Sequence, residues 1–355
     1  MDLDNNLSDE VSGMKNSLST DRMDISFGEI MSIYERGELI IDPEFQRLFR
    51  WSNDQQTRFI ESLLLGIPIP PIFVAEDQDG KWELVDGMQR ISTVLSFFGL
   101  LKVFHEKNKW TLTKGDFVPS LKDYNIDNLP LKLNLNLKRA ACRIEIINWN
   151  SKIDMRYELF KRLNTGGSPL TDQEIRNCIF RGESTEFNHI LKRLSEKVVF
   201  RDLIVFTDKQ KAEKYPEELV LRFSSLVYNS EIITESLSVY MTDFMRDVVN
   251  KKTVNFLEFE KLFDRTFNLI SPLGCEIFRG ANGSFSSSYF DGITIGIARN
   301  IDFYEKERPE NLKQKINELR DSDKFKKFMG TAASSKDRVM GRIRVAVEIF
   351  SPRAI

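Results

Sequence analysis

Residues 85–98, VDGMQRISTVLSFF, contain the strand-to-helix turn from which the fold of this chain can be predicted. Apolar residues lead into Asp86-Gly87, and a Gln-Arg pair, two hydroxyl residues and a second apolar run follow. This order predicts a strand that turns at the glycine and passes into a helix at about residues 89–98. One interpretation is a plain turn before a helix, and the other is an anion-binding pocket.

The pocket interpretation depends on the charges at the start of the predicted helix. The free N–H groups of a first helical turn carry partial positive charge, so an arginine there is unfavourable unless an anion is bound. Arg90 could bind phosphate oxygens through two parallel hydrogen bonds, and Ser92 and Thr93 could add hydroxyl donors. The P-loop pattern, GxxxxGK followed by Ser or Thr, is absent from the sequence.

The segments around this turn predict a region of mixed helices and strands. Ser52 and Gln55 form a capping-box pattern, and Gly66 suits the end of the helix that follows. The dipeptide at residues 79–80, Asp-Gly, is typical of a hairpin turn. Residues 129–138, LPLKLNLNLK, alternate with period two, which favours a strand over a distorted helix. Further helices are expected at residues 25–33, at 153–163 and from the capping box at 171–174, with strands at 72–75, 82–85 and 142–149.

Beyond about residue 183 the sequence predicts a mostly helical region, because charged and apolar residues recur there at helical spacing. The first 22 residues are polar, lack periodicity and are typical of a flexible tail. We therefore expect a tail at residues 1–22, a first domain at 23–182 and an α-helical domain at 183–355.

The composition excludes several classes of site. The chain has 355 residues, a net charge of -2 and 41% hydrophobic residues, as is ordinary for a globular protein. Cys142, Cys178 and Cys275 are too widely spaced for a zinc site or a disulfide framework. His105 and His189 are the only histidines, which argues against histidine-based nuclease or metal chemistry. The polar N-terminus and the lack of a long apolar run predict a soluble, cytoplasmic protein without a membrane span.

Two other segments carry patterns compatible with anion binding. In EFQRLFRW, residues 44–51, Arg47 and Arg50 lie among aromatic residues, so they either stack on the rings or bind an anion. In FKRLNTGGSPLTDQEIRN, residues 160–177, Asn164 begins an Asn-Thr-Gly-Gly segment between two predicted helices. Such a segment is also sound structural chemistry for a helix end, so each pattern alone leaves both interpretations open.

Taken together and in this order, EFQRLFRW, ELVDGMQRIST and FKRLNTGGSPLTDQEIRN resemble the hallmarks of the GmrSD-type N-terminal family. That family includes the GmrS half of modification-dependent restriction enzymes and the phage-defence protein SspE. The resemblance covers about residues 25–180, and KDRVMGRIR at residues 336–344 shows a weaker similarity to the family. It implies an α+β chain in which a ParB/sulfiredoxin-like nucleotide-binding domain is followed by a mostly α-helical domain.

The resemblance also implies roles for individual residues. Asp86, Gln89 and Arg90 would be catalytic residues acting on a nucleoside triphosphate (NTP). Asp86 would in addition hold Mg²⁺ together with the nucleotide, since this ion favours carboxylate and phosphate oxygens. The other implied nucleotide- and phosphate-binding residues are Arg47, Arg50, Gly87, Ser92, Thr93 and Asn164.

Two departures from the family pattern bear on function. The family hallmark usually reads Asp-Gly-Gln-Gln-Arg, and Met88 replaces its first glutamine here. Many relatives carry a C-terminal His-Asn-His-type nuclease domain, whereas no histidine follows His189 in this sequence. We therefore expect an NTP-hydrolysing module of a restriction or anti-phage system that regulates the engagement of DNA or of a separate nuclease subunit. The alternative is a non-catalytic, ParB-like adaptor that binds DNA or protein.

A basic pair near the end of the sequence has a separate interpretation. Arg338 and Arg342 are one helical turn apart and would share a face of the last predicted helix. Contact with DNA phosphates is one interpretation of this face. A solvated face opposite the apolar Val339 and Ile343 is the other.

Overall fold

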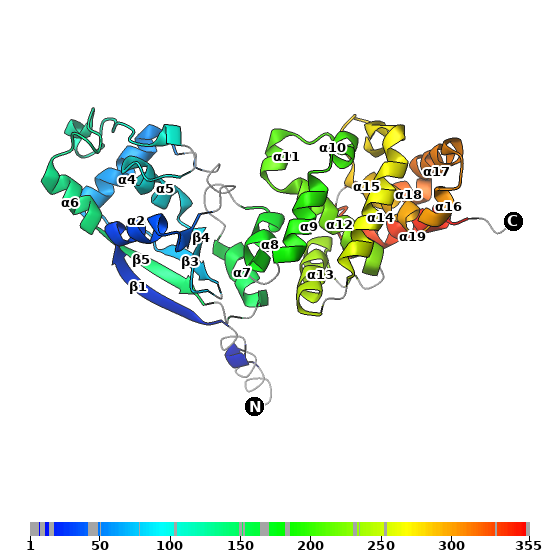
Figure 1. Ribbon diagram of the computed structural model, residues 1–355, viewed down its shortest axis with the longest axis horizontal. Helices are drawn as coiled ribbons and strands as arrows, with labels where there is room; N and C mark the ends of the chain where they lie inside the picture. The colour runs from blue at the N-terminus through cyan, green and yellow to red at the C-terminus, as the bar shows by residue number, and fades with distance from the viewer. Residues whose placement is uncertain are drawn as a thin grey trace. The chain divides into compact units, whose positions relative to one another are not determined.

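The computed structural model describes most of the chain, which divides into two compact units, residues 1–169 and 170–355. The expected α+β class, with a mostly helical second part, is confirmed (Figure 1). The described residues are 7, 11–13, 18–41, 49, 51–77, 79–102, 105–148, 151, 153–163, 170–181, 185–229, 233, 235–251, 254–330 and 332–352.

The first unit contains, within the described residues, a five-stranded mixed sheet in the order β1-β5-β3-β4-β2. The β1/β5 and β3/β4 pairs are antiparallel, and the β3/β5 and β2/β4 pairs are parallel. Its strands are β1 (Thr20–Ser26), β2 (Leu39–Ile40), β3 (Ile72–Glu76), β4 (Trp82–Asp86) and β5 (Ala141–Ile147). Its helices are α2 (Phe27–Glu35), α4 (Asn53–Leu65), α5 (Met88–Phe97), α6 (Leu131–Arg139) and α7 (Ile153–Leu163), with short 3-10 turns η1 (His105–Lys107) and η2 (Pro119–Leu121).

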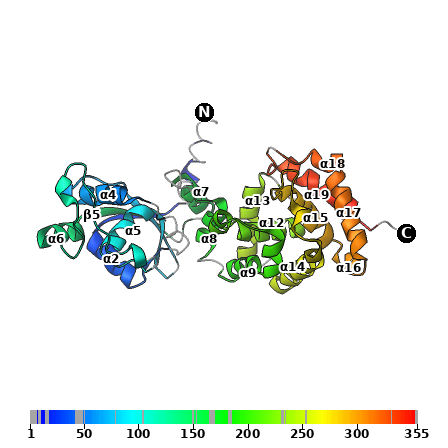
Figure 2. The ribbon, with the colours of Figure 1, turned by 90° about the horizontal axis from the view of Figure 1, so that it is seen from above.

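The core of this unit lies between the sheet and its helices. Alternate strand residues point to one face, as the period of a strand requires, and Ile72 and Ile144 are buried there. Phe27, Ile60 and Leu95 from α2, α4 and α5 are buried in the same cluster. Both ribbon views show these three helices gathered against the sheet (Figures 1 and 2). The cluster therefore fixes the start of α5 against the strands beside it.

Local signals at the element ends are confirmed. Ser52 and Gln55 form the expected capping box at the start of α4, and Gly66 ends the helix in the left-handed conformation. Gly80 has a φ of 77° at the turn between β3 and β4, as the Asp-Gly pattern predicts. Each of these features depends on residues only a few positions apart, which explains why the sequence revealed them.

Two segments differ from the sequence-based expectation. Residues 20–22 are in strand β1 rather than in a tail, and the ion pair between Asp24 and Arg143 (3.0 Å) ties β1 to β5. Residues 131–139 form helix α6 rather than a strand. The helix buries Leu137 but leaves Leu131 74% exposed, because residues six apart lie on different sides of a helix. Lys138 and Arg139 lie in its last turn, where cations are favourable.

The elements that the structure describes in the second unit are all helices, apart from an isolated β-bridge between Arg279 and Phe285, and phenylalanine rings dominate its core. Phe200, Phe223, Phe263, Phe267 and Phe290 are all buried, and the rings of Phe263 and Phe267 lie 4.3 Å apart. Its elements are α8 (Asp172–Arg181), α9 (Thr185–Ser195), α10 (Val198–Ile204), α11 (Asp208–Ala212), α12 (Tyr215–Asn229), α13 (Leu237–Lys251), α14 (Phe256–Ile270), η4 (Ser271–Leu273), η5 (Cys275–Phe278), α15 (Ser287–Ala298), α16 (Ile301–Tyr304), α17 (Pro309–Asp321), α18 (Asp323–Lys326) and α19 (Lys336–Phe350).

The division between the units falls before α8, whereas the sequence placed a domain boundary between residues 182 and 183. Helix α8 packs against α9, α12 and α13, so it is part of the helical unit. The predicted capping box at its start is present, because Thr171 N–H donates to Glu174 Oε2 and Glu174 N–H donates to Thr171 Oγ1.

Candidate functional site

Strand β4 ends at Asp86, and helix α5 begins after Gly87. Gly87 has a φ of 102°, and a Cβ atom there would lie 2.2 Å from Ile72 Cδ1. Only glycine therefore fits both the backbone conformation and the space. Gly87 gives α5 no side-chain cap, and no acidic residue lies in the first turn of the helix. The turn thus begins a helix whose positive end is not neutralised by a capping side chain.

Arg90 lies in this first turn, and its guanidinium binds three neighbouring oxygen atoms. Nη2 donates to Asp86 Oδ2 at 2.7 Å, and Nη1 donates to the carbonyls of Pro70 and Pro71. The arginine side chain is only 12% exposed. Among the described residues, no acceptor bonds its Nε–H or its second Nη2–H.

Asp86 is more accessible than its arginine partner, with 42% of its side chain exposed. Its Oδ2 accepts the bond from Arg90, and no donor in the described part of the chain bonds its Oδ1. The described residues contain no group of three or more His, Cys, Asp or Glu side chains that could hold a metal ion. A cation here would therefore need further oxygen ligands from a bound molecule.

Gln89 joins the first two sequence motifs. The backbone N–H of Trp51, the last residue of EFQRLFRW, donates to Gln89 Oε1 at 3.2 Å. The structure thus places the end of the first motif against the first turn of α5, as a joint site requires. The carboxamide oxygen of Gln89 contacts protein backbone in this arrangement.

Ser92 and Thr93 lie in the interior of the unit, with no measurable exposure. The Ser92 hydroxyl donates to Met88 Sδ at 3.2 Å, and Thr93 Oγ1 finds no partner among the described residues. Neither hydroxyl is offered at the surface, so this conformation does not present them to a phosphate. Met88 is half-buried and packs against the hydrophobic core, so it adds no polar group beside Arg90.

Three of the sequence-predicted residues lie outside the described residues: Arg47, Arg50 and Asn164. The predicted residues that the structure brings together are therefore Asp86, Gly87, Gln89 and Arg90. All four belong to one strand-to-helix turn, and Trp51 joins them from the first motif.

The expectation that Arg342 contacts DNA is not supported. Arg342 is fully buried in the helical unit, where its Nε donates to Asp291 Oδ2 at 2.7 Å. Arg222 donates to the same carboxylate from α12, so two arginines share one aspartate. Arg338 donates to the carbonyls of Lys327 and Met329. The solvated-face interpretation is equally wrong for Arg342, because the side chain is buried. Hydropathy spacing could not predict this, since it does not reveal Asp291 as a buried partner.

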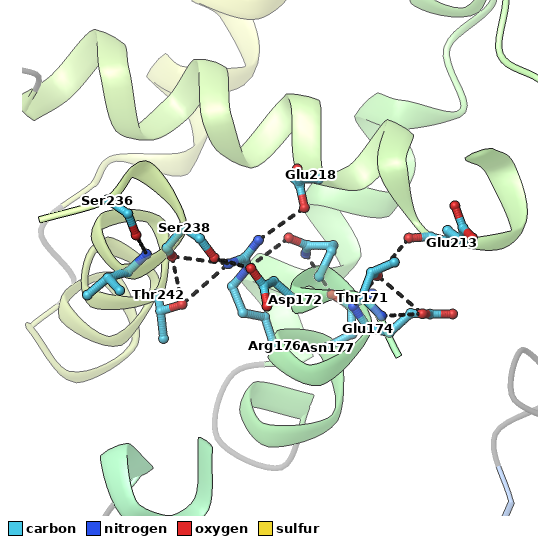
Figure 3. Close-up of polar contacts among 12 residues, drawn as sticks. Thr171, Asp172, Glu174, Arg176, Asn177, Glu213, Glu218, Ser236, Ser238 and Thr242 are labelled. Carbon is cyan, nitrogen blue, oxygen red and sulfur yellow. Dashed lines mark hydrogen bonds and ion pairs between the residues drawn. The ribbon is translucent and has the colours of Figure 1, made fainter. Parts of the chain in front are cut away.

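The last part of the third motif contains residues of a buried polar network that the sequence did not lead us to expect. Arg176 is fully buried on α8, and its guanidinium binds residues from two other helices (Figure 3). Nη1 donates to Ser238 and Thr242 of α13, and Nη2 donates to Glu218 of α12 at 3.2 Å. The signal in the sequence was a dense run of polar residues, TDQEIRN, which begins just before α8 and makes up its first half.

Asn177 extends this buried polar network. Its Nδ2 donates to Glu217 Oε2 at 2.6 Å, and its Oδ1 accepts a bond from Gln173. Lys214 pairs with the same glutamate at 3.1 Å. These contacts fix α8 to α12 and α13, which explains why the end of the third motif folds with the helical unit.

A comparison with protein families matches residues 27–181 to the family described as GmrSD restriction endonuclease, N-terminal domain. This part of the chain is a GmrSD N-terminal domain. The match contains β2 to β5, the turn at Gly87 and helix α8, and its end lies next to the predicted limit at residue 182. Comparisons with curated proteins and with solved structures gave no match.

The matched family is described as part of a restriction endonuclease, and the match covers 155 of the 355 residues of the chain. The sequence prediction of this family is thereby confirmed. In the described part of the chain, no helix combines the length and apolar character needed to cross a membrane.

Proposed function

We propose that this GmrSD N-terminal domain binds a nucleoside triphosphate and hydrolyses it, and thereby regulates how DNA or a separate nuclease subunit is engaged. One observation carries the proposal: Arg90 lies in the first turn of a helix that has neither a side-chain cap nor an acidic residue there. A helix N-terminus with an arginine beside it favours phosphate through both charge and N–H donors.

Each residue of the turn would have a separate role in binding the nucleotide. Arg90 would bind phosphate oxygens through Nε–H and the remaining Nη2–H, while its other bonds to Asp86 and Pro71 keep the guanidinium in place. Gln89 would hold Trp51 against the same turn. Gly87 would let the backbone turn from β4 into α5 over the buried Ile72, which sets the position of the first turn of the helix.

The donor set fits Mg²⁺ only when the nucleotide is present. Asp86 offers one carboxylate oxygen that bonds no described donor, and the ion commonly takes one or two carboxylates together with phosphates and water. Asp86 Oδ1 would therefore hold Mg²⁺ with the phosphates. The bound ion would neutralise charge on the phosphate oxygens, which stabilises the transferring group.

The test is a panel of the four NTPs with Mg²⁺, with and without DNA, in which binding and phosphate release are both measured. We expect the wild type to bind at least one nucleotide and Arg90→Ala to lose binding. Since Arg90 also holds Pro70 and Pro71, Arg90→Lys serves as a second variant that keeps the charge, and unfolding curves show which variants are folded. Arg139→Ala on α6, an exposed position, is the matched control. Retained binding in a folded Arg90→Ala protein overturns the proposal.

The alternative is an adaptor that binds nucleotide without turnover, and Met88 favours it. The family pattern has a glutamine at this position, whereas Met88 packs on the core and its Sδ accepts the Ser92 hydroxyl. Measurable binding without phosphate release would support the adaptor. In that case Met88→Gln is expected to restore turnover if the missing carboxamide is the cause.

A further inference from the structure

Phe49 and Trp51, the described residues of the first motif, accept hydrogen bonds from or donate them to side chains from three other elements. Trp51 N–H donates to Gln89 Oε1 of α5, and Trp51 O accepts a bond from Gln56 Nε2 of α4 at 2.8 Å. Phe49 O accepts a bond from Lys107 Nζ of η1 at 2.9 Å. The two described residues of the motif are therefore held on both sides of position 50.

Lys107 makes a second contact with the same residue. Its ammonium lies 5.1 Å from the centroid of the Phe49 ring, within the range of a cation–π interaction. Phe49 as a whole residue is only 3% exposed. Lys107 thus holds Phe49 by its carbonyl and by its face, and nothing in the sequence motifs pointed to this lysine.

These contacts form one connected path to the candidate site. Lys107 fixes Phe49, Trp51 follows two residues later, and Trp51 bonds Gln89, the neighbour of Arg90 in the first turn of α5. We propose that Lys107 is a positioning residue of the anion site, which it supports by holding Phe49 and thereby keeping Trp51 against α5. The inference rests on the proposed function and deepens it, because it assigns a residue that prepares the site for its ligand.

The decisive variant is Lys107→Met, which keeps an unbranched side chain over the Phe49 ring but removes the ammonium. Lys107→Arg restores a cationic donor, and Lys122→Met, an exposed lysine, is the control. Two quantities are measured on the full chain. The first is the rate of chymotrypsin cleavage after Phe49 and Trp51, read by mass spectrometry, and the second is affinity for inorganic tripolyphosphate by calorimetry.

We expect Lys107→Met to increase cleavage by about tenfold and to weaken tripolyphosphate binding by about tenfold, the effect of losing one charge-assisted hydrogen bond. Lys107→Arg should recover most of both, and Lys122→Met should match the wild type. Unchanged cleavage in Lys107→Met overturns the inference, as does faster cleavage with unchanged affinity. An absence of binding by the wild type overturns the proposed function instead, and the cleavage assay shows separately whether Lys107 holds the segment.

Discussion

Arg90 Nη2 lies 2.7 Å from Asp86 Oδ2, so the acid at the end of β4 and the arginine in the first turn of α5 form an ion pair. The same guanidinium donates to the carbonyl of Pro71, directly before β3. One side chain therefore joins two strand ends and a helix start. The Asp and Arg of the motif act as a unit, and a change in one alters the charge that the other presents to a ligand.

Asp86→Asn is expected to change binding and turnover in opposite directions. Removing the carboxylate charge beside Arg90 should raise affinity for tripolyphosphate without Mg²⁺ by several-fold, about 1 kcal/mol for a partly exposed pair. Mg²⁺-dependent phosphate release should fall, because the variant lacks the carboxylate for the ion. Calorimetry and a phosphate-release assay measure the two effects. Asp116→Asn, in an exposed ion pair with Arg58, is the control; parallel losses of binding and turnover in Asp86→Asn would contradict the shared role.

Gly87→Ala is expected to destabilise the first unit more than Gly66→Ala does. Both glycines have positive φ values, 102° and 69°. A Cβ at Gly66 meets nothing within 4 Å, so only the cost of a left-handed backbone conformation, about 1–2 kcal/mol, applies. A Cβ at Gly87 would in addition overlap Ile72 and should raise the cost to about 2–4 kcal/mol. Urea unfolding measures both, and equal losses would show that Ile72 yields without penalty.

The sequence revealed the parts of the fold that neighbouring residues decide. The caps at Ser52 and Gly66 and the turn at Gly80 depend on contacts within a few positions, so they were predictable. Strand β1 was not predictable from its own residues, because TDRMDIS is polar and the partner of Asp24 is Arg143, far along the chain. Helix α6 carries a strand-like leucine pattern that the packing of Leu137 overrides.

The candidate site shows the same division. Asp86, Gly87 and Arg90 adjoin in sequence, so their meeting at one turn was predictable from the motif. Lys107 and Arg176 were not found, because their partners come from other elements and neither has a spacing signature. The burial of a side chain also cannot be predicted from its residue type alone. For this reason the hydroxyls of Ser92 and Thr93 were expected to bind phosphate, although both residues are buried.

The buried thiol of Cys142 is expected to make the folded protein less stable in alkaline solution. Burial raises the pKa of its thiol to about 11 from an ordinary 9.0, although the charge of Arg90 acts against this. The unfolded chain therefore releases the proton at lower pH than the folded one. The contribution to stability is complete below pH 9.0 and is lost as pH rises to about 11, by about 2–3 kcal/mol in total. Urea unfolding between pH 8.5 and 10.5 should show a shallower decline for Cys142→Ala, and equal declines would contradict the assignment.

Substitutions in the buried cluster of Arg222, Asp291 and Arg342 are expected to destabilise the protein by unequal amounts. The cluster holds two positive charges and one negative charge, and Arg342 and Asp291 have no measurable exposure. Burial lowers the pKa of Arg342, and the charge of Asp291 opposes this. Asp291→Asn would leave two buried arginines without a counter-charge, at a cost of about 3–5 kcal/mol. Arg342→Met would leave the neutral pair of Arg222 and Asp291, so it should cost less, about 1–2 kcal/mol.

Thermal unfolding measures the loss of stability in each of the two variants. The control is Arg344→Met, at an exposed position of α19, and its stability should lie within about 0.5 kcal/mol of the wild type. A larger loss in Arg342→Met than in Asp291→Asn would show that the bond from Arg342 to the carbonyl of Ala333 outweighs the charge balance.

The Arg342→Met variant also tests whether Arg342 contacts DNA. Because Arg342 is enclosed, folded Arg342→Met should retain whatever DNA affinity and salt dependence the wild type has. A reduced salt dependence in the folded variant would mean that the arginine reaches phosphate, which its burial against Asp291 opposes.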